Sequence, residues 1–301
     1  MHLKVLSLNY FRTHISYSEP AESYSEPVEL CLVQRAGLAY NAVSMTPLFE
    51  TNKPNVKITD YQDADYEKGF WGERQYEDMI EQSVIRRLIK GPYSKLIDIG
   101  GGFGRLIPSY ISAVKERSLL FDYSQKLLDS AQVRFHNEPR FEAIQGSFYD
   151  IPLDKHTFDA AISVRVIHHV EDVATYLKEI NRVLKPDATF ILEYANKRNW
   201  LEILRRLIGR SKLHPFSLSP ENRSISGLTI NFHPRYLKRM LALKGFKIEK
   251  QVASSLLRSP LLKKLVGQRM MAKIENSIPL WIRPFALTPS VFLVLRKVKD
   301  A

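Results

Sequence analysis

Two aspartates and a run of glycines carry the clearest chemical information in this chain. Asp98 lies at the end of the short apolar segment 96–99, and a second acid, Asp122, closes the next apolar run, residues 119–121. The turn after the first segment contains Gly100, Gly102 and Gly104. Glycines let a bound ligand approach the backbone closely, because no side chain blocks it. Two strands that end in acids around such a turn predict a nucleoside pocket in a doubly wound α/β sheet.

The spacing of the glycines distinguishes between nucleoside ligands. The dinucleotide fingerprint is G-x-G-x-x-G. Counted from Gly100 it fails, because Arg105 occupies the last glycine position, and counted from Gly102 it fails at Ile107. A nicotinamide-dependent dehydrogenase is therefore the weakest of the alternatives for this chain.

The pattern that remains, D-x-G-x-G-x-G from Asp98 to Gly104, resembles the first motif of class I S-adenosylmethionine-dependent methyltransferases. The resemblance implies that S-adenosylmethionine is the cofactor and that the three glycines contact it. It places Asp98 near the cationic methionine end of the cofactor. It also implies that Asp122 accepts hydrogen bonds from the ribose hydroxyls, with Tyr123 beside it.

Similarity to the same family continues for about a hundred residues. Residues 146–153 are similar to its third motif, in which an acid after the glycine binds the adenine amino group. Here that position is Ser147, followed by Phe148, and a neutral acceptor makes a weaker hydrogen bond than a charged one. Further matching segments follow in the family's order at residues 158–164, 166–172, 179–186 and 189–193. They imply a Rossmann-like, mostly parallel sheet of seven strands with an antiparallel last strand. Within the family, the chain resembles the ubiquinone- and menaquinone-biosynthesis methyltransferase-like (type 11) group.

An aromatic segment, residues 65–78, precedes the first strand and is similar to the segment that folds over the cofactor in many of these enzymes. Tyr66 and Arg74 are the candidates for contacts to the methionine end. For Phe70 and Trp71, a cluster that seals the edge of the sheet is at least as good an interpretation as a contact to the cofactor. The helix expected next carries a regular apolar stripe of Ile80, Val84 and Leu88.

Methyl transfer from a sulfonium is an in-line displacement, so the main task of the protein is to align the reacting atoms. A neutral hydroxyl or amine acceptor also needs a base to take its proton. His168 and His169 follow the expected fourth strand, and His169 is the preferred candidate, although packing roles are an open alternative for both. Arg165 is expected either to orient an anionic group or to pair with a nearby acid.

Composition sets the broad class of the protein. A chain of 301 residues with 45% hydrophobic content is long and apolar enough to bury a large core. The family resemblance implies a methyltransferase domain over about residues 56–301, after a poorly patterned extension of residues 1–55. The single cysteine, Cys31, excludes an internal disulfide and suits a reducing cytoplasm, and no metal site is predicted.

The net charge of +12 is concentrated in the second half of the chain. Two segments there, at about 196–231 and 260–281, exceed the minimal fold. Each pairs an apolar helical stripe with basic residues, among them Arg205, Arg206 and Arg210. We expect them to form a helical cap over the pocket, or alternatively to contact an anionic membrane peripherally.

The motifs exclude some acceptors and leave others open. Enzymes that methylate base amino groups carry an acid or Asn followed by two prolines after the fourth strand. In this chain Ser163, Val164 and Arg165 occupy that position instead. Nucleic acid is therefore not the expected partner, and a small molecule, lipid or quinone is. A non-catalytic adenosylmethionine-binding module is the alternative function, favoured by Ser147. The sequence does not predict the oligomeric state.

Overall fold

A computed structural model describes residues 66–222, 228–258, 260–280 and 287–301, with side chains for all of these except Tyr66, Lys68 and residues 260–262. The expected extension, residues 1–55, lies outside the described residues.

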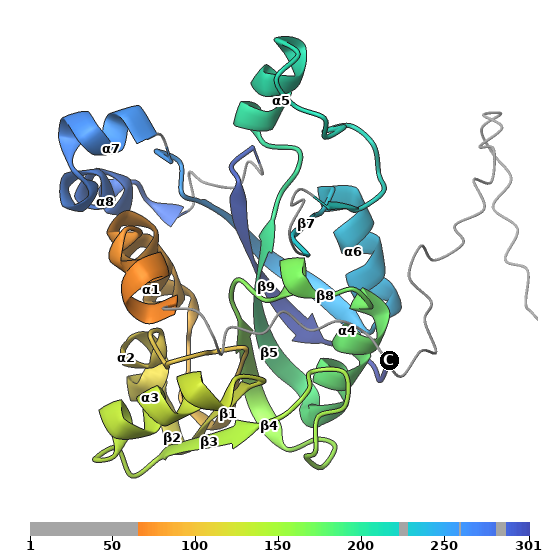
Figure 1. The fold of residues 1–301 in the computed structure, drawn as a ribbon. Helices are drawn as coiled ribbons and strands as arrows, with labels where there is room; N and C mark the ends of the chain where they lie inside the picture. The colour runs from red at the N-terminus through yellow and green to blue at the C-terminus, as the bar shows by residue number, and fades with distance from the viewer. Residues whose placement is uncertain (1–65, 223–227, 259, 281–286) are drawn as a thin grey trace, which may run out of the picture. The chain divides into compact units, whose positions relative to one another are not determined.

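The described structure is built on one seven-stranded sheet, which confirms the fold class predicted from sequence (Figure 1). Its strands, in spatial order, are β3 (Phe141–Gln145), β2 (Val114–Asp122), β1 (Tyr93–Ile99), β4 (Phe158–Ser163), β5 (Leu184–Ala195), β9 (Ser290–Lys297) and β8 (Phe246–Ser254). The first five of these are parallel to one another. The last strand of the chain, β9, is antiparallel to both β5 and β8, as expected.

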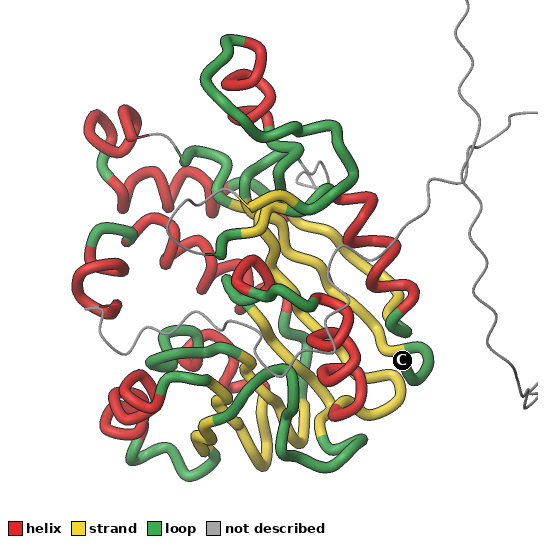
Figure 2. The backbone as a smooth tube through the Cα atoms, turned by 45° about the vertical axis from the view of Figure 1, so that its right-hand side comes forward, coloured by secondary structure: helices red, strands yellow, loops and turns green. Residues whose placement is uncertain are grey.

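Helices cover both faces of this sheet (Figure 2). They are α1 (Gln75–Leu88), α2 (Ile107–Tyr110), α3 (Gln125–Phe135), α4 (Val173–Val183), α5 (Trp200–Leu207), α6 (Pro234–Leu243), α7 (Pro260–Val266) and α8 (Gln268–Ser277). Alternate residues of a strand point to opposite faces, so Leu96 packs with α1, whereas Ile97 packs with α4. Strands buried on both faces are continuously apolar, and that is why short apolar runs marked them in the sequence.

Helix α1 buries the predicted stripe of Ile80, Val84 and Leu88 against the sheet. Helix α6 begins after His233, whose ring accepts the backbone N–H of Arg235 at 3.2 Å, and Gly245 follows its end with φ of +76°. Helix α1 therefore confirms the helix that the apolar stripe predicts. The remaining short elements are Tyr66–Phe70, Ile111–Ala113, Ile167–His169, β6 (Glu221–Asn222) and β7 (Ile230–Asn231).

Both additional segments leave the same edge of the sheet. The first follows the carboxyl end of β5, and the second follows that of β8, which runs parallel to β5 because each is antiparallel to β9. Helix α8 packs on α1 through the buried residues Met271 and Ala272. No helix among the described residues is long and apolar enough to cross a membrane.

Helix α5 has the opposite orientation to the one that a cap requires. It buries Glu202, at 2% exposure, while Leu207 at its end is 79% exposed. The described residues therefore do not show apolar stripes closed over a pocket. The sequence pattern is the same whichever face of an amphipathic helix is buried, so it could not distinguish the two orientations.

Candidate active site

The turn between β1 and α2 is held in place by the acid at the end of β2. Asp122 Oδ2 accepts the backbone N–H of Gly102 at 2.8 Å, and its Oδ1 accepts that of Ser124 at 2.9 Å. The backbone N–H of Gly100 also donates to the carbonyl of Phe121 at 2.7 Å. The two strand ends and the start of α3 are thereby fixed as one unit.

The three motif glycines are required for two different reasons. All have positive φ, and a Cβ on Gly100 would lie 2.3 Å from Val166 Cγ2. A Cβ on Gly104 would lie 2.7 Å from Ile107 Cδ1. Close approach of a ligand was the expected reason for all three, but Gly100 and Gly104 are also required by packing. Only Gly102 has space beside it, with the nearest atom at 3.5 Å.

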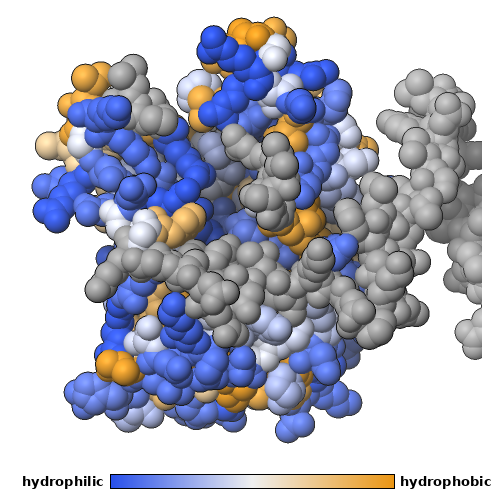
Figure 3. Space-filling view, viewed as in Figure 1, coloured by the Kyte–Doolittle hydropathy of each residue, from blue (hydrophilic) through white to orange (hydrophobic). Residues whose placement is uncertain are grey.

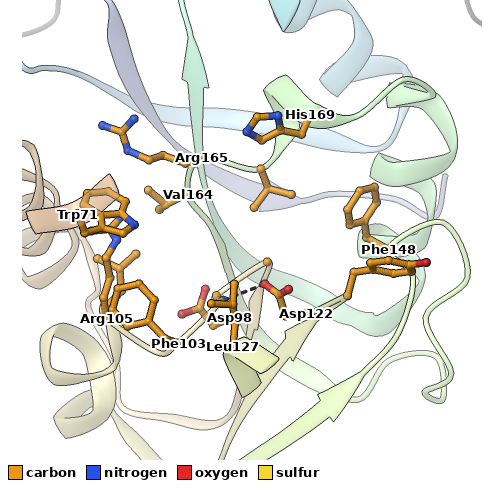
Figure 4. A pocket seen from close by; sticks show the side chains of 16 residues that line it. Trp71, Asp98, Phe103, Arg105, Asp122, Leu127, Phe148, Val164, Arg165 and His169 are labelled. Atoms are coloured by element: carbon orange, nitrogen blue, oxygen red, sulfur yellow. Dashed lines mark hydrogen bonds between the residues drawn. The ribbon is translucent and has the colours of Figure 1, made fainter. Parts of the chain in front are cut away.

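A pocket opens above this turn, at the carboxyl ends of β1, β2 and β4 (Figure 4). Its lining includes eight of the predicted site residues: Asp98, Gly100, Gly102, Asp122, Tyr123, Phe148, Arg165 and His169. In Figure 4, the two acids lie on one side of the pocket and His169 on the other. Three separate motifs therefore converge on one cavity.

Four other predicted residues do not line the pocket. Gly104 packs beneath the turn, and His168 lies beside His169 with ring centroids 4.2 Å apart. Ser147 Oγ accepts the backbone N–H of Tyr149 at 3.2 Å within its own turn. The Arg74 guanidinium lies over the Phe70 ring, 4.1 Å from its centroid. The side chain of Tyr66 lies outside the described residues.

Sequence reasoning missed part of the lining. Trp71 lines the pocket, although its place in the sequence fits a role in sealing the sheet edge equally well. The Arg105 guanidinium stacks on its ring, 3.7 Å from the centroid. Phe103 and Leu127 complete an apolar cluster with Trp71. Arg105 directly follows the last motif glycine, and that position was the signal in the sequence that it would lie at the pocket.

A buried charge network joins the pocket wall to α1. Glu81 is fully buried, and its carboxylate bridges Arg105 Nη2 at 2.5 Å and Arg165 Nε at 2.7 Å. Burial alone would raise the pKa of Glu81, but the two guanidinium groups hold it below its usual value. Asp78 pairs with the other side of Arg105 at 2.9 Å. Of the two roles expected for Arg165, pairing with an acid is the one that the structure contains.

The motif acid Asp98 is almost completely buried. Its Oδ2 accepts a hydrogen bond from the Tyr110 hydroxyl at 3.1 Å. Burial raises the pKa of Asp98 to about 7, although the Tyr110 hydrogen bond and Arg105 act in the opposite direction. A cation bound in the pocket would therefore favour the ionised carboxylate.

His169 has a defined tautomer. Its Nδ1 donates to the backbone carbonyl of Leu228 at 2.7 Å, so a neutral ring carries its lone pair on Nε2. Burial lowers the pKa of His169 below its usual value, and the charge of Arg165 lowers it further. The ring is therefore neutral at pH 7, as a proton acceptor must be. Leu228 belongs to the first additional segment, which thus orients a pocket residue although its described residues do not line the pocket.

Comparison with known proteins agrees with this geometry. A family model described as "Methyltransferase domain" matches residues 97–192, which run from β1 to β5. A probable S-adenosylmethionine-dependent methyltransferase of Mycolicibacterium smegmatis is 28% identical over 134 residues, 44% of this chain and 48% of that protein. Demethylmenaquinone methyltransferase of Chlorobaculum tepidum is 26% identical over 126 residues, 41% of this chain and 51% of that protein. The chain thus spans about half the length of these two curated relatives.

Solved structures share the fold at low sequence identity. A Thermotoga maritima methyltransferase, described as a possible histamine N-methyltransferase, matches 77% of this chain and 94% of its own at 20% identity, with a TM-score of 0.53. A chain from the Haloferax volcanii complex of the Trm112 methyltransferase activator with a methyltransferase matches 81% of this chain and 100% of its own, at 15% identity and a TM-score of 0.58. The fold, the motif turn and the matched domain together define the class: this chain carries a class I S-adenosylmethionine-dependent methyltransferase domain.

Proposed function

We propose that the protein transfers the methyl group of S-adenosylmethionine to a small or lipid-like acceptor, of quinone-like character, by in-line displacement. The observation that carries this proposal is the convergence of Asp98, Asp122 and His169 on one pocket from three different strand ends. The cofactor would supply an activated methyl carbon on a positively charged sulfur. The residues of the chain would bind and align it.

The described residues fit this cofactor. Asp122 lines the pocket, and its carboxylate oxygens are acceptors of the kind that ribose hydroxyls require. Asp98 is a buried acid whose ionised form a cationic ligand would stabilise. Gly102 leaves space for the ligand above the backbone, and Phe148 offers an apolar surface from the third motif. Ser147 faces its own turn, so it is a weaker candidate for the adenine contact.

His169 is the proposed proton acceptor. The cofactor would supply a methyl carbon whose bond to sulfur would break, with its electrons returning to sulfur, as a lone pair on the acceptor oxygen or nitrogen formed the new bond. The acceptor proton would pass to His169 Nε2, which has the lone pair because Nδ1 donates to Leu228. General base catalysis of this kind contributes about 10²–10⁴-fold in rate.

The acceptor class rests on the chemistry of the pocket and on the relatives. Part of the pocket wall is apolar, with Trp71, Phe103 and Val164 among its residues. A flat, lipophilic acceptor suits such a wall. The demethylmenaquinone methyltransferase among the relatives acts, by its name, on a quinone. That similarity covers part of each chain and supports the class of acceptor.

The test is a label-transfer screen with methyl-labelled S-adenosylmethionine and a panel of quinols, phenolic natural-product intermediates and lipid extracts. Label in an extractable product, together with S-adenosylhomocysteine in equal amount, is the expected result. Tight cofactor binding with no transfer to any acceptor in the panel would favour the alternative, a non-catalytic adenosylmethionine-binding module. Product formation that is unchanged in His169→Asn would remove that residue from the mechanism.

A further inference from the structure

Helix α5 presents an apolar surface to solvent. Trp200, Leu204, Leu207 and Ile208 recur on one side of the helix, and each is about half exposed or more, Leu207 at 79%. The side of the helix that is buried carries an acid, Glu202. Amphipathic helices of globular proteins normally have the reverse arrangement. An apolar stripe displayed in this way marks an interaction surface.

The acids of this segment are neutralised internally, so its outward charge is positive. Glu202 pairs with Arg205 at 2.5 Å and accepts the Ser211 hydroxyl at 2.9 Å. Glu221 pairs with the buried Lys197 at 2.7 Å. The exposed cations next to the stripe are Arg206, Arg210 and Lys212.

A second surface of the same kind lies on α7 and α8. Helix α8 uses Met271 and Ala272 to pack on α1, and the one acid on this helix, Glu275, is buried and hydrogen-bonded to the Tyr76 hydroxyl. The residues turned outward are apolar or basic: Leu265, Val266, Arg269, Met270, Lys273 and Ile274. Two helix units far apart in the sequence therefore share one pattern, in which the acid is buried and the apolar and basic side chains are exposed.

The two surfaces lie at the same end of the described structure. Figure 1 places α5 and the α7–α8 pair beyond the carboxyl ends of β5 and β8, and in the turned view of Figure 2 these helices stay at the same end of the sheet. Figure 3 shows hydrophobic patches at the tip of α5 and on the outer side of α7, each next to strongly hydrophilic surface. This is also the edge of the sheet at which the pocket opens.

We propose that these helices form a docking surface for an anionic lipid membrane. The docking surface consists of the exposed apolar and basic residues of α5, of residues 208–212 after it, and of α7–α8. Its apolar residues would enter the interface between headgroups and acyl chains, while its cations would contact anionic headgroups. An acidic protein partner would match the charge, but it would leave unexplained why two separate helix units expose apolar side chains next to their cations. The proposal goes beyond the proposed function, because it names a surface and a partner rather than a reaction.

The experiment is flotation of the full chain with vesicles of phosphatidylcholine, with and without phosphatidylglycerol. We expect binding only to the anionic vesicles, and we expect added salt to weaken it. The double variant Leu207→Glu/Leu265→Glu removes one apolar anchor from each helix unit, and it should lower the partition coefficient by about a hundredfold or more. Arg206→Gln/Arg210→Gln should lower it by roughly thirtyfold.

Val133→Glu is the matched control. Val133 is 77% exposed on α3, so the control places the same charge on an equally exposed apolar position outside the docking surface. It should bind vesicles as the wild type does. Titration with S-adenosylhomocysteine in parallel separates the two proposals, because the leucine variants should keep wild-type cofactor affinity.

Three results would overturn the docking proposal. The first is absence of the wild type from anionic vesicles at low salt. The second is equal loss of binding in the Val133→Glu control. The third is self-association of the wild type in light scattering, without binding to vesicles. In this case the leucine variants would abolish the self-association. That outcome would assign the surface to a second copy of the chain.

Discussion

The carboxylate of Asp122 accepts the backbone N–H of Gly102 at 2.8 Å, so the acid at the end of β2 holds the turn that follows β1. Both residues line the pocket. The proposed ribose ligand and the glycine turn therefore depend on the same side chain. A change at Asp122 removes a contact to the cofactor and loosens the backbone that the cofactor approaches.

The glycines of the turn should respond differently to alanine. Gly100→Ala places a methyl group 2.3 Å from Val166 in a backbone with φ of +69°, so we expect a loss of unfolding free energy of about 2–4 kcal/mol. Gly102→Ala has only the strain of its φ of +56°, and should cost about 1–2 kcal/mol. Denaturant unfolding measures both. Calorimetry should show that Gly102→Ala, although the milder change in stability, impairs cofactor binding. Equal destabilisation by the two variants would contradict the packing described here.

The raised pKa of Asp98 makes stability depend on pH. Burial moves this pKa from 3.8 to about 7, so between these values the folded protein holds a proton that the unfolded chain has released. The contribution of Asp98 to the free energy of unfolding is therefore full below about pH 4, and is lost as the pH rises to about 7. Asp98→Asn should flatten this part of the stability profile, as measured by denaturant unfolding at several pH values.

The same residue should couple cofactor binding to proton release. A cationic ligand favours the ionised carboxylate, so S-adenosylmethionine should displace a proton from Asp98 near and below pH 7. Calorimetry in two buffers with different ionisation enthalpies measures that release. Proton release of the same size in Asp98→Asn would show that another group is responsible.

The buried network around Glu81 should be sensitive to loss of its central charge. Glu81→Gln leaves Arg105 and Arg165 without their shared carboxylate, and should cost about 3–5 kcal/mol of unfolding free energy. Glu142→Gln is the control, because it breaks an exposed pair with Arg117 and should cost about 0–1 kcal/mol. Chemical denaturation compares them, and similar small losses would mean that the buried network has little energetic role.

His169 should set the acid limb of the methyl-transfer rate. Its pKa is lowered by burial, so the neutral base persists below its ordinary value of about 6.5, and the rate should fall only at lower pH. His169→Asn should reduce kcat by about 10²–10⁴-fold at pH 7. His136→Asn, an exposed histidine on the surface near α3, should leave both rate and pH profile unchanged. Once an acceptor is in hand, an unaltered acid limb in His169→Asn would exclude this role.

The part of the site that the sequence predicted consists of residues close to one another in the chain or at strand ends. Asp98, Gly102 and Asp122 follow short apolar runs, and the parallel order of the strands then brings them together. The network of Glu81 was not predictable in the same way. Its partner Arg165 lies 84 residues away, and no local pattern specifies that a helix acid will meet it.

The orientation of the helices at the edge of the fold could not be predicted from the sequence either. Trp200 and Leu207 form the stripe that periodicity predicts, but the stripe is exposed because Glu202 is held inside by Arg205 and Ser211. Periodicity identifies an amphipathic face and gives no information about what covers it. Trp71 was missed for a related reason, since an aromatic residue at a sheet edge has the same pattern whether it faces a pocket or packing neighbours.

The most direct test of the central claim is calorimetric titration of wild type, Asp122→Ala and Asp129→Ala with S-adenosylmethionine, S-adenosylhomocysteine and NAD. Asp129 is an exposed acid of α3 and serves as the control for loss of charge. We predict that the wild type and the control bind both adenosyl compounds, and do not bind NAD. Asp122→Ala should bind the adenosyl compounds about 5- to 150-fold more weakly, because about 1–3 kcal/mol of hydrogen bonding is lost. Wild-type affinity in Asp122→Ala, or binding of NAD in place of the adenosyl compounds, would contradict the account.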